Sequence, residues 1–110
     1  MDMKDLEFMR IWDRYSPLLT RTQREMTDLY FNYDLSLTEI AEEKGCSKQG
    51  VSDCLNICHK KLEEYEQKLG FAEQTVRVKE ALGLFAKRNP EHAEEILKIA
   101  DLLDGKGGEE

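Results

Sequence analysis

The stretch LTEIAEEKGCSKQGVSDCLNICHKKLEEYEQKL, residues 37–69, decides the fold, because it has the pattern of a helix-turn-helix. Ala41 is the small residue needed where the two helices cross, and Gly45 makes the turn. Ser47 can cap the helix that follows. From there apolar residues recur at alternating spacings of four and three, which predicts one long helix with an apolar seam. The seam consists of Val51, Leu55, Cys58, Leu62, Tyr65 and Leu69.

The turn also needs apolar residues that hold its two helices at a fixed angle, and Ile40, Cys46 and Val51 stand at the expected positions. Lys44 departs from the usual pattern, because the position before the turn glycine is more often apolar. Its aliphatic stem can cover the core while its ammonium group reaches water. We therefore expect a buried core around the turn that includes the cysteine.

Two helices are predicted ahead of this unit. The first covers residues 3–15 and ends at Ser16, because the residue before a proline avoids the helical conformation. The second covers residues 21–32, where Thr20 and Gln23 have the spacing of a capping box. Helical periodicity assigns one set of residues to the inward faces. They are Phe8, Ile11, Trp12, Tyr15, Met26, Leu29, Tyr30 and Tyr33.

Two more helices are predicted after the stop signal at Gly70. One covers residues 72–87, and the other covers residues 90–104, with Asn89 as its cap, Pro90 at its first position and Gly105 as its stop. No strand pattern appears, so the expected fold is all-α. It consists of a helix-turn-helix domain (1–69) with a long recognition helix, a C-terminal helical extension (70–104) and a disordered tail (105–110). The extension is expected to pack on, or swap with, the 48–69 helix.

Composition limits the class of protein. The chain has 110 residues and a net charge of −7, so binding to phosphates would have to come from a local basic patch. No run of about eighteen apolar residues is present, which predicts no membrane insertion. The N-terminus MDMKDLEF lacks the layout of a signal peptide. Three cysteines in such a chain are expected to be reduced thiols, and the expected location is the cytoplasm.

The start of the 48–69 helix is the candidate binding site. In a helix-turn-helix this part enters the major groove, where Gln49 and Asn56 can pair with adenine and Lys48 with guanine or a phosphate. Between residues 47 and 61, three lysines (48, 60 and 61) against Asp53 give a local balance of +2. The candidate nucleic-acid-binding residues are Ser47, Lys48, Gln49, Ser52, Asp53, Asn56, His59, Lys60, Arg21 and Arg24. The alternative is a helical corner used for packing or protein contact.

Metal binding and catalysis find little support in the sequence. Cys54 and Cys58 are one helical turn apart, but His59 points about 100° further round the helix. Four ligands with zinc-site spacing are missing, so no metal and no cofactor is expected. The cysteines at apolar positions, Cys46 and Cys58, are better explained as core thiols. Ser47 and His59 have no basis for a catalytic triad, and an enzyme is not expected.

The chain resembles the YlxM family of small bacterial helix-turn-helix proteins, which are associated with the signal recognition particle. The resemblance runs from about residue 6 to residue 103. It is carried by LLTRTQREMTDLYFNYDLSLTEIAEE, by GCSKQGVSD and by KLEEYEQKL. The first two segments are also similar to region 4 of bacterial sigma factors, which reads promoter DNA through this arrangement. That likeness places Ser47, Lys48, Gln49, Ser52 and Asp53 at the start of the recognition helix.

The resemblance implies binding to the signal recognition particle, through its RNA or its GTPase, rather than promoter recognition. The first hypothesis is therefore a non-enzymatic regulatory protein in the protein-targeting pathway. The second is a transcriptional regulator that binds DNA as a dimer, with its recognition helices about 34 Å apart. The third is a helical adaptor without a nucleic-acid partner. The apolar rows of the helices at 48–69, 72–87 and 90–104 predict a homodimer in the first two cases.

Overall fold

The computed structural model describes residues 5–104, which are helices joined by short connections, with no strand among them. The all-α prediction is confirmed. The main helices are α1 (Leu6–Tyr15), α2 (Arg21–Phe31), α3 (Leu37–Lys44), α4 (Lys48–Leu69), α5 (Phe71–Arg88) and α6 (Ala93–Asp101). Three short 3-10 helices accompany them: η1 (Ser16–Leu18), η2 (Pro90–His92) and η3 (Leu102–Asp104).

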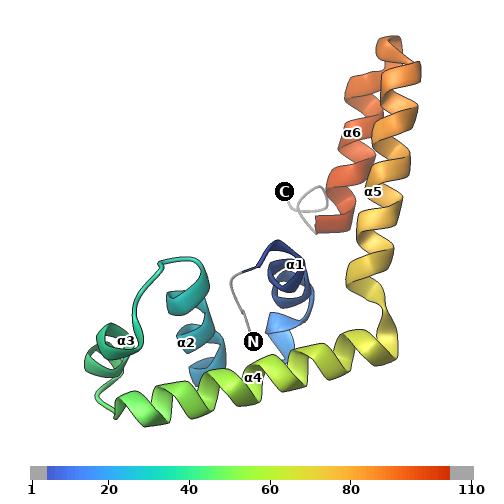
Figure 1. Cartoon of the computed structure of the whole chain (residues 1–110). Helices are drawn as coiled ribbons and strands as arrows, with labels where there is room; N and C mark the ends of the chain where they lie inside the picture. Colours follow the sequence, from blue (N-terminus) through green and yellow to red (C-terminus); the bar gives the residue numbers. More distant parts are fainter. Residues whose placement is uncertain (1–4, 105–110) are drawn as a thin grey trace. The chain divides into compact units, whose positions relative to one another are not determined.

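The described residues form two compact units, one that ends at Gly70 and one that begins at Phe71. In the first unit α1, α2 and α3 lie along one side of the long helix α4 (Figure 1). In the second unit α5 and α6 pack on each other. Among residues 5–104, no helix combines the length and the apolar character that crossing a bilayer requires.

Local signals set the helix ends of the first unit. The capping box at Thr20 is formed as predicted, because its side chain accepts from the Gln23 N–H while the Gln23 side chain accepts from the Thr20 N–H. Ser36 forms an equivalent box at the start of α3. Gly45 (φ 69°) and Gly70 (φ 66°) end α3 and α4 in the left-handed conformation, which glycine adopts without the penalty that a side chain imposes.

The ends of α1 differ in part from the prediction. The predicted start at residue 3 lies outside the described residues, and Asp5 caps the helix by accepting from the Phe8 N–H at 2.7 Å. The helix stops at Tyr15 as predicted, but the expected reason was wrong. Ser16 keeps helical dihedral angles (φ −56°, ψ −31°), because the chain continues as the 3-10 helix η1. The backbone becomes extended only at Leu19.

The start of the last helix was also predicted wrongly. Asn89 does not cap it, because its side-chain Nδ2 donates to the Phe85 carbonyl at 3.0 Å and so serves the end of α5. Pro90 opens the 3-10 helix η2, and the α-helix begins at Ala93. The predicted stop at Gly105 and the predicted tail at 105–110 lie outside the described residues.

Tyr33 is a further correction, because 65% of it is exposed although helical periodicity assigned it to an inward face. The helix α2 ends at Phe31, and Asp34 has a positive φ of 55°, so Tyr33 belongs to a reversing turn and not to a helical stripe. The other inward positions predicted for α2 are buried or half-buried. They are Met26, Leu29 and Tyr30.

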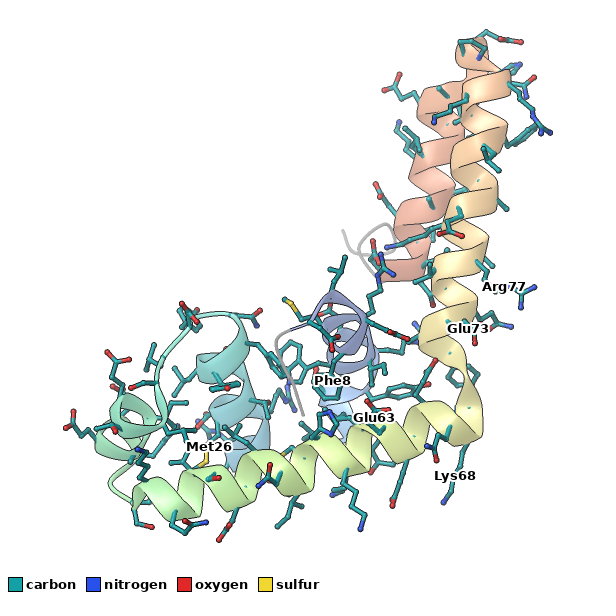
Figure 2. The ribbon with its side chains drawn as sticks, in the orientation of Figure 1. Phe8, Met26, Glu63, Lys68, Glu73 and Arg77 are labelled. Atoms are coloured by element: carbon teal, nitrogen blue, oxygen red, sulfur yellow. The ribbon has the colours of Figure 1, made fainter. Side chains whose placement is uncertain are left out.

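The core of the first unit follows the apolar seam of α4. Four seam residues are at most 3% exposed: Val51, Leu55, Cys58 and Leu62. Met26 points from α2 toward the first half of α4, and Phe8 points from α1 toward its middle (Figure 2). Ile40, from α3, is fully buried. Each of the three preceding helices therefore contributes apolar side chains to one continuous core along α4.

The helix α1 covers the second half of α4, an arrangement that the sequence pattern did not predict. The ring of Phe8 stacks on His59 with centroids 4.5 Å apart. The ring of Tyr15 lies 5.9 Å from that of Tyr65, and its hydroxyl donates to Glu66 Oε1 at 2.7 Å. The first helix therefore packs against part of the helix on which the C-terminal extension was expected to pack.

The three cysteines differ in environment. Cys46 is exposed, so its assignment to the core was wrong, whereas Cys54 is half-buried and Cys58 is buried as predicted. Ile40 and Val51 close the core at the turn, and Cys46 stands where the chain passes from α3 to α4. Burial, followed by the neighbouring Cys54 thiol, raises the pKa of Cys58 to about 12.

Thiol alkylation is expected to follow this order. Because the thiolate is the nucleophile, iodoacetamide at mildly alkaline pH should modify Cys46 first, Cys54 more slowly and Cys58 only after unfolding. Peptide mass spectrometry over time, with a urea-unfolded control in which all sites react, measures the order. Equal rates for Cys46 and Cys58 in the folded chain would contradict the burial of Cys58.

Candidate nucleic-acid interface

The turn between α3 and α4 has the geometry of a helix-turn-helix. The N–H groups of Gly45 and Cys46 both donate to the Ala41 carbonyl, which closes the end of α3. Ser47 then caps α4, because its Oγ accepts from the Gly50 N–H at 2.9 Å. The small side chain of Ala41 is 7% exposed, so it lies in the contact between the helices as predicted. The turn therefore fixes the direction in which α4 leaves α3.

One exposed row of polar residues runs along α4 on the side opposite its buried seam. Its members follow one another at helical spacing, and we call them the α4 polar stripe: Gln49, Asp53, Asn56 and Lys60. All are exposed. Within the stripe, Gln49 Nε2 donates to Asp53 Oδ1 at 2.9 Å, which engages one of the two N–H groups of the amide. The stripe is the part of the predicted site that the structure brings together.

Three other predicted residues lie near this stripe. Lys48 is exposed on the first turn of α4, and Ser52 is half-buried beside the stripe. Ser47 is exposed, but its hydroxyl is engaged as the helix cap. Its function in the structure is therefore to start α4, and its O–H can still donate to a ligand while its oxygen accepts from Gly50.

His59 does not join the stripe. Its side chain is 20% exposed and stacks on Phe8, and its Nε2 lies 3.7 Å from Glu63 Oε2. An imidazole held between an aromatic ring and a carboxylate belongs to the contact between α1 and α4. The structure thus places this predicted binding residue in the packing of the first unit.

Arg21 and Arg24 lie on α2 and are exposed. Arg21 Nε is 3.2 Å from Glu25 Oε2, and the other carboxylate oxygen of Glu25 accepts from Lys44 Nζ at 2.5 Å. The hydrogen bond from Lys44, and then that from Arg21, holds the pKa of Glu25 below its usual range. Arg21 therefore belongs to an ion-pair network that joins α2 to α3.

The same network explains Lys44, the residue that departs from the usual pattern. Its side chain is 26% exposed, and its ammonium group pairs with Glu25. The sequence predicted that the aliphatic part of Lys44 covers the core while its ammonium group reaches water, but it did not predict the ion pair with Glu25. No periodicity could have revealed it, because the pair joins residues nineteen positions apart on two helices.

Two exposed positions beside the stripe were missing from the predicted site. Gly50 leaves the backbone of α4 open to close approach by a ligand, because it has no side chain. Ile57 is 55% exposed and offers an apolar contact next to Asn56. A helical wheel of residues 48–69 would have shown both positions on the side of the helix away from the apolar seam. Among residues 5–104, no cluster of three or more potential metal ligands is formed.

The helix that precedes the turn is acidic on its exposed side. Glu39, Glu42 and Glu43 are exposed on α3. In helix-turn-helix complexes with duplex DNA, the first helix crosses the phosphate backbone. These carboxylates would therefore face like charge if α4 lay in a major groove in the usual way. The positive residues of α4 and the acidic face of α3 favour a ligand that contacts mainly α4.

The chain is similar in sequence to several proteins named UPF0122. The chain is 47% identical over 68 residues to a UPF0122 protein of Clostridium kluyveri, a match that covers 62% of this chain and 61% of that protein. It is 37% identical over 98 residues to a UPF0122 protein of Clostridium perfringens, covering 86% and 88%. A relative from Symbiobacterium thermophilum is 41% identical over 76 residues, covering 68% and 71%.

A family-wide match extends over nearly the whole described chain. Residues 3–102 match the family described as "Putative helix-turn-helix protein, YlxM / p13 like". This range includes the turn, the α4 polar stripe and both helices of the second unit. The resemblance to the YlxM family is thereby confirmed, and with it the helix-turn-helix class of regulatory or nucleic-acid-binding proteins. The chain belongs to the UPF0122 family of YlxM-like helix-turn-helix proteins.

Proposed function

We propose that this chain is a non-enzymatic regulatory protein of the signal recognition particle pathway and that the α4 polar stripe binds the RNA of the particle. The stripe carries the proposal, because a complete helix-turn-helix presents four exposed polar side chains on one face. The pathway rests on the resemblance to the YlxM family. The GTPase of the particle is the protein partner to test against the RNA.

The distribution of charge favours RNA over duplex DNA. A side chain can reach the bases of a looped or single-stranded RNA from one face, because these bases are not enclosed in a groove. Lys48 and Lys60 on α4 can then contact phosphates while Glu42 and Glu43 on α3 stay away from the ligand. A transcriptional regulator is the second candidate, because Gln49 and Asn56 are exposed on the α4 polar stripe and amide side chains of this kind can pair with adenine.

The chemistry of the polar groups supports a role without catalysis. Ser47 uses its hydroxyl as a helix cap, and His59 is packed on Phe8. Burial raises the pKa of Cys58 to about 12, which keeps its thiol protonated. These candidate nucleophiles and bases are each engaged in holding the fold.

Nucleic-acid titrations test this proposal. We expect the chain to bind signal-recognition-particle RNA more tightly than random duplex DNA, with an affinity that falls as salt is added. Lys48→Ala and Lys60→Ala should each weaken binding by roughly three- to tenfold at low salt and reduce the salt slope by about 0.7, the value for one phosphate contact to a single strand. Fluorescence anisotropy at several salt concentrations measures both quantities.

Lys87→Ala is the matched control, because Lys87 is an exposed lysine of the second unit. It should leave binding and salt slope unchanged. Unchanged RNA binding in both α4 variants would rule out this face as the RNA site. Tighter binding to duplex DNA would favour the transcriptional regulator, and binding to the targeting GTPase without RNA affinity would favour a protein partner.

A further inference from the structure

The second unit has too few buried side chains for a stable pair of helices. Between residues 71 and 104 the buried residues are Ala72, Ala86 and Ile96. Isolated units of fewer than about 40 residues usually need a disulfide, a metal or oligomerisation for stability. Large apolar residues of this unit are exposed instead: Phe71, Val78, Leu84, Phe85, Leu97, Ile99 and Leu102. A second layer of protein over α5 and α6 would cover them.

The apolar residues of α5 form a stripe with regular spacing. Val78 and Phe85 are 39% and 53% exposed and lie seven residues apart, and Phe71 lies seven residues before Val78. Residues at this spacing share one side of a helix. Gln74 and Ala81 lie beside them and carry no charge, and the small Ala81 allows another backbone to come close. We call Phe71, Val78 and Phe85 the α5 apolar stripe.

Charged residues of α5 lie away from this stripe. Lys79 is turned toward α6 and pairs with Asp104 of η3 at 2.6 Å. Arg77 projects from α5 on the side away from α6 (Figure 2). Depletion of charge at the centre of an exposed apolar face is typical of the core of a protein interface.

The stripe has phenylalanine at both ends and valine in the middle, so it can match a second copy of itself. We propose that two copies dimerise through the α5 apolar stripe, with their α5 helices antiparallel and Val78 at the two-fold axis. Because the stripe is symmetric about Val78, this arrangement places Phe71 opposite the partner's Phe85 in both halves of the contact. A two-fold interface has to match itself in this way.

Helix dipoles favour the antiparallel arrangement over the parallel one. Antiparallel helices place the N-terminus of each α5 beside the C-terminus of the other, so opposite partial charges meet at both ends of the contact. Parallel helices would bring like partial charges together at both ends. The apolar seam of α4 is not proposed as part of the dimer contact. Leu62 is buried, and Tyr65 packs on Tyr15 within the first unit.

Sedimentation equilibrium of the full chain tests the dimer. The wild-type chain should sediment as a dimer in the micromolar range. Val78→Glu should weaken dimerisation at least tenfold, because it places two carboxylates at the axis. Glu80→Lys, an exposed change outside the stripe on the same helix, should have little effect. A monomeric wild-type chain at high micromolar concentration, or equal effects of the two variants, would overturn the proposal.

Cysteine crosslinking tests the orientation and does not depend on any ligand. In a Cys46→Ser background, which removes the exposed native thiol, Val78→Cys should form a disulfide-linked dimer on mild oxidation. Phe85→Cys alone should crosslink poorly, because antiparallel helices hold the two copies of this position far apart. Glu80→Cys is the control for random collision. Efficient crosslinking through Phe85→Cys, or none through Val78→Cys, would rule out the antiparallel contact.

Discussion

Replacing Phe8 by alanine is expected to lower the free energy of unfolding of the first unit by about 3–5 kcal/mol. The side chain is 2% exposed, lies 5.4 Å from the ring of Phe31 and stacks on His59. It is therefore in contact with both α2 and α4. Its removal leaves a cavity at the point where three helices meet, and a cavity adds to the lost burial of apolar surface.

Urea unfolding followed by Trp12 fluorescence measures this effect. Trp12 is the single tryptophan, and it lies in the same unit, where its indole N–H donates to Thr27 Oγ1 at 2.7 Å. Leu6→Ala is the matched control on the same helix, because Leu6 is 65% exposed and should change stability by less than about 0.5 kcal/mol. Similar decreases in the free energy of unfolding for the two variants would show that α1 does not pack on α4 through Phe8.

The elements that the sequence predicted well are those set by local chemistry. The starts of α2 and α4 follow from Thr20 and Ser47, whose side chains satisfy N–H groups of their own first turns. The ends of α3 and α4 follow from Gly45 and Gly70, since both adopt a positive φ. Such signals involve neighbouring residues, and they can therefore be read from a single chain.

The errors arise where a residue's environment depends on distant parts of the chain or on an unexpected turn. The length of α4 was predicted correctly. The packing of α1 on α4 was not predicted, because it depends on pairs such as Tyr15 with Glu66, which are 51 positions apart. Tyr33 and Cys46 satisfied the apolar pattern, yet both lie in connections where helical periodicity no longer applies. An apolar residue therefore gives a reliable prediction of burial only where the helix is known to continue.

The candidate site shows the same division. The α4 polar stripe follows from helical spacing, and its residues were predicted. The packing of His59 on Phe8 was not predicted, because it depends on which helix lies beside α4. The pairing of Arg21 with Glu25 was also not predicted, although it joins positions i and i+4 of one helix and could have been read from the sequence. The stripe and Lys48 are therefore better supported as contact residues than the flanking histidine and arginine.

Gly45→Ala is expected to destabilise the first unit by about 1–2 kcal/mol. Gly45 has φ 69° and ψ 38°, a left-handed conformation that strains any residue with a Cβ, although no atom lies within 4 Å of where that Cβ would stand. The loss would therefore come from the backbone and not from a clash. Relief of this strain would change the angle between α3 and α4, so we expect ligand binding by the α4 polar stripe to weaken as well.

Gly83→Ala is the control that separates backbone strain from loss of glycine itself. Gly83 lies inside α5, and its added Cβ would also meet no atom within 4 Å. Alanine is the better helix former by about 1 kcal/mol, so this variant should stabilise the second unit. Thermal unfolding followed by circular dichroism and by Trp12 fluorescence resolves the two effects. Opposite signs for two identical substitutions would establish that the left-handed turn, and not the flexibility of glycine, holds the helix-turn-helix in place. Equal signs would contradict the assigned conformation of Gly45.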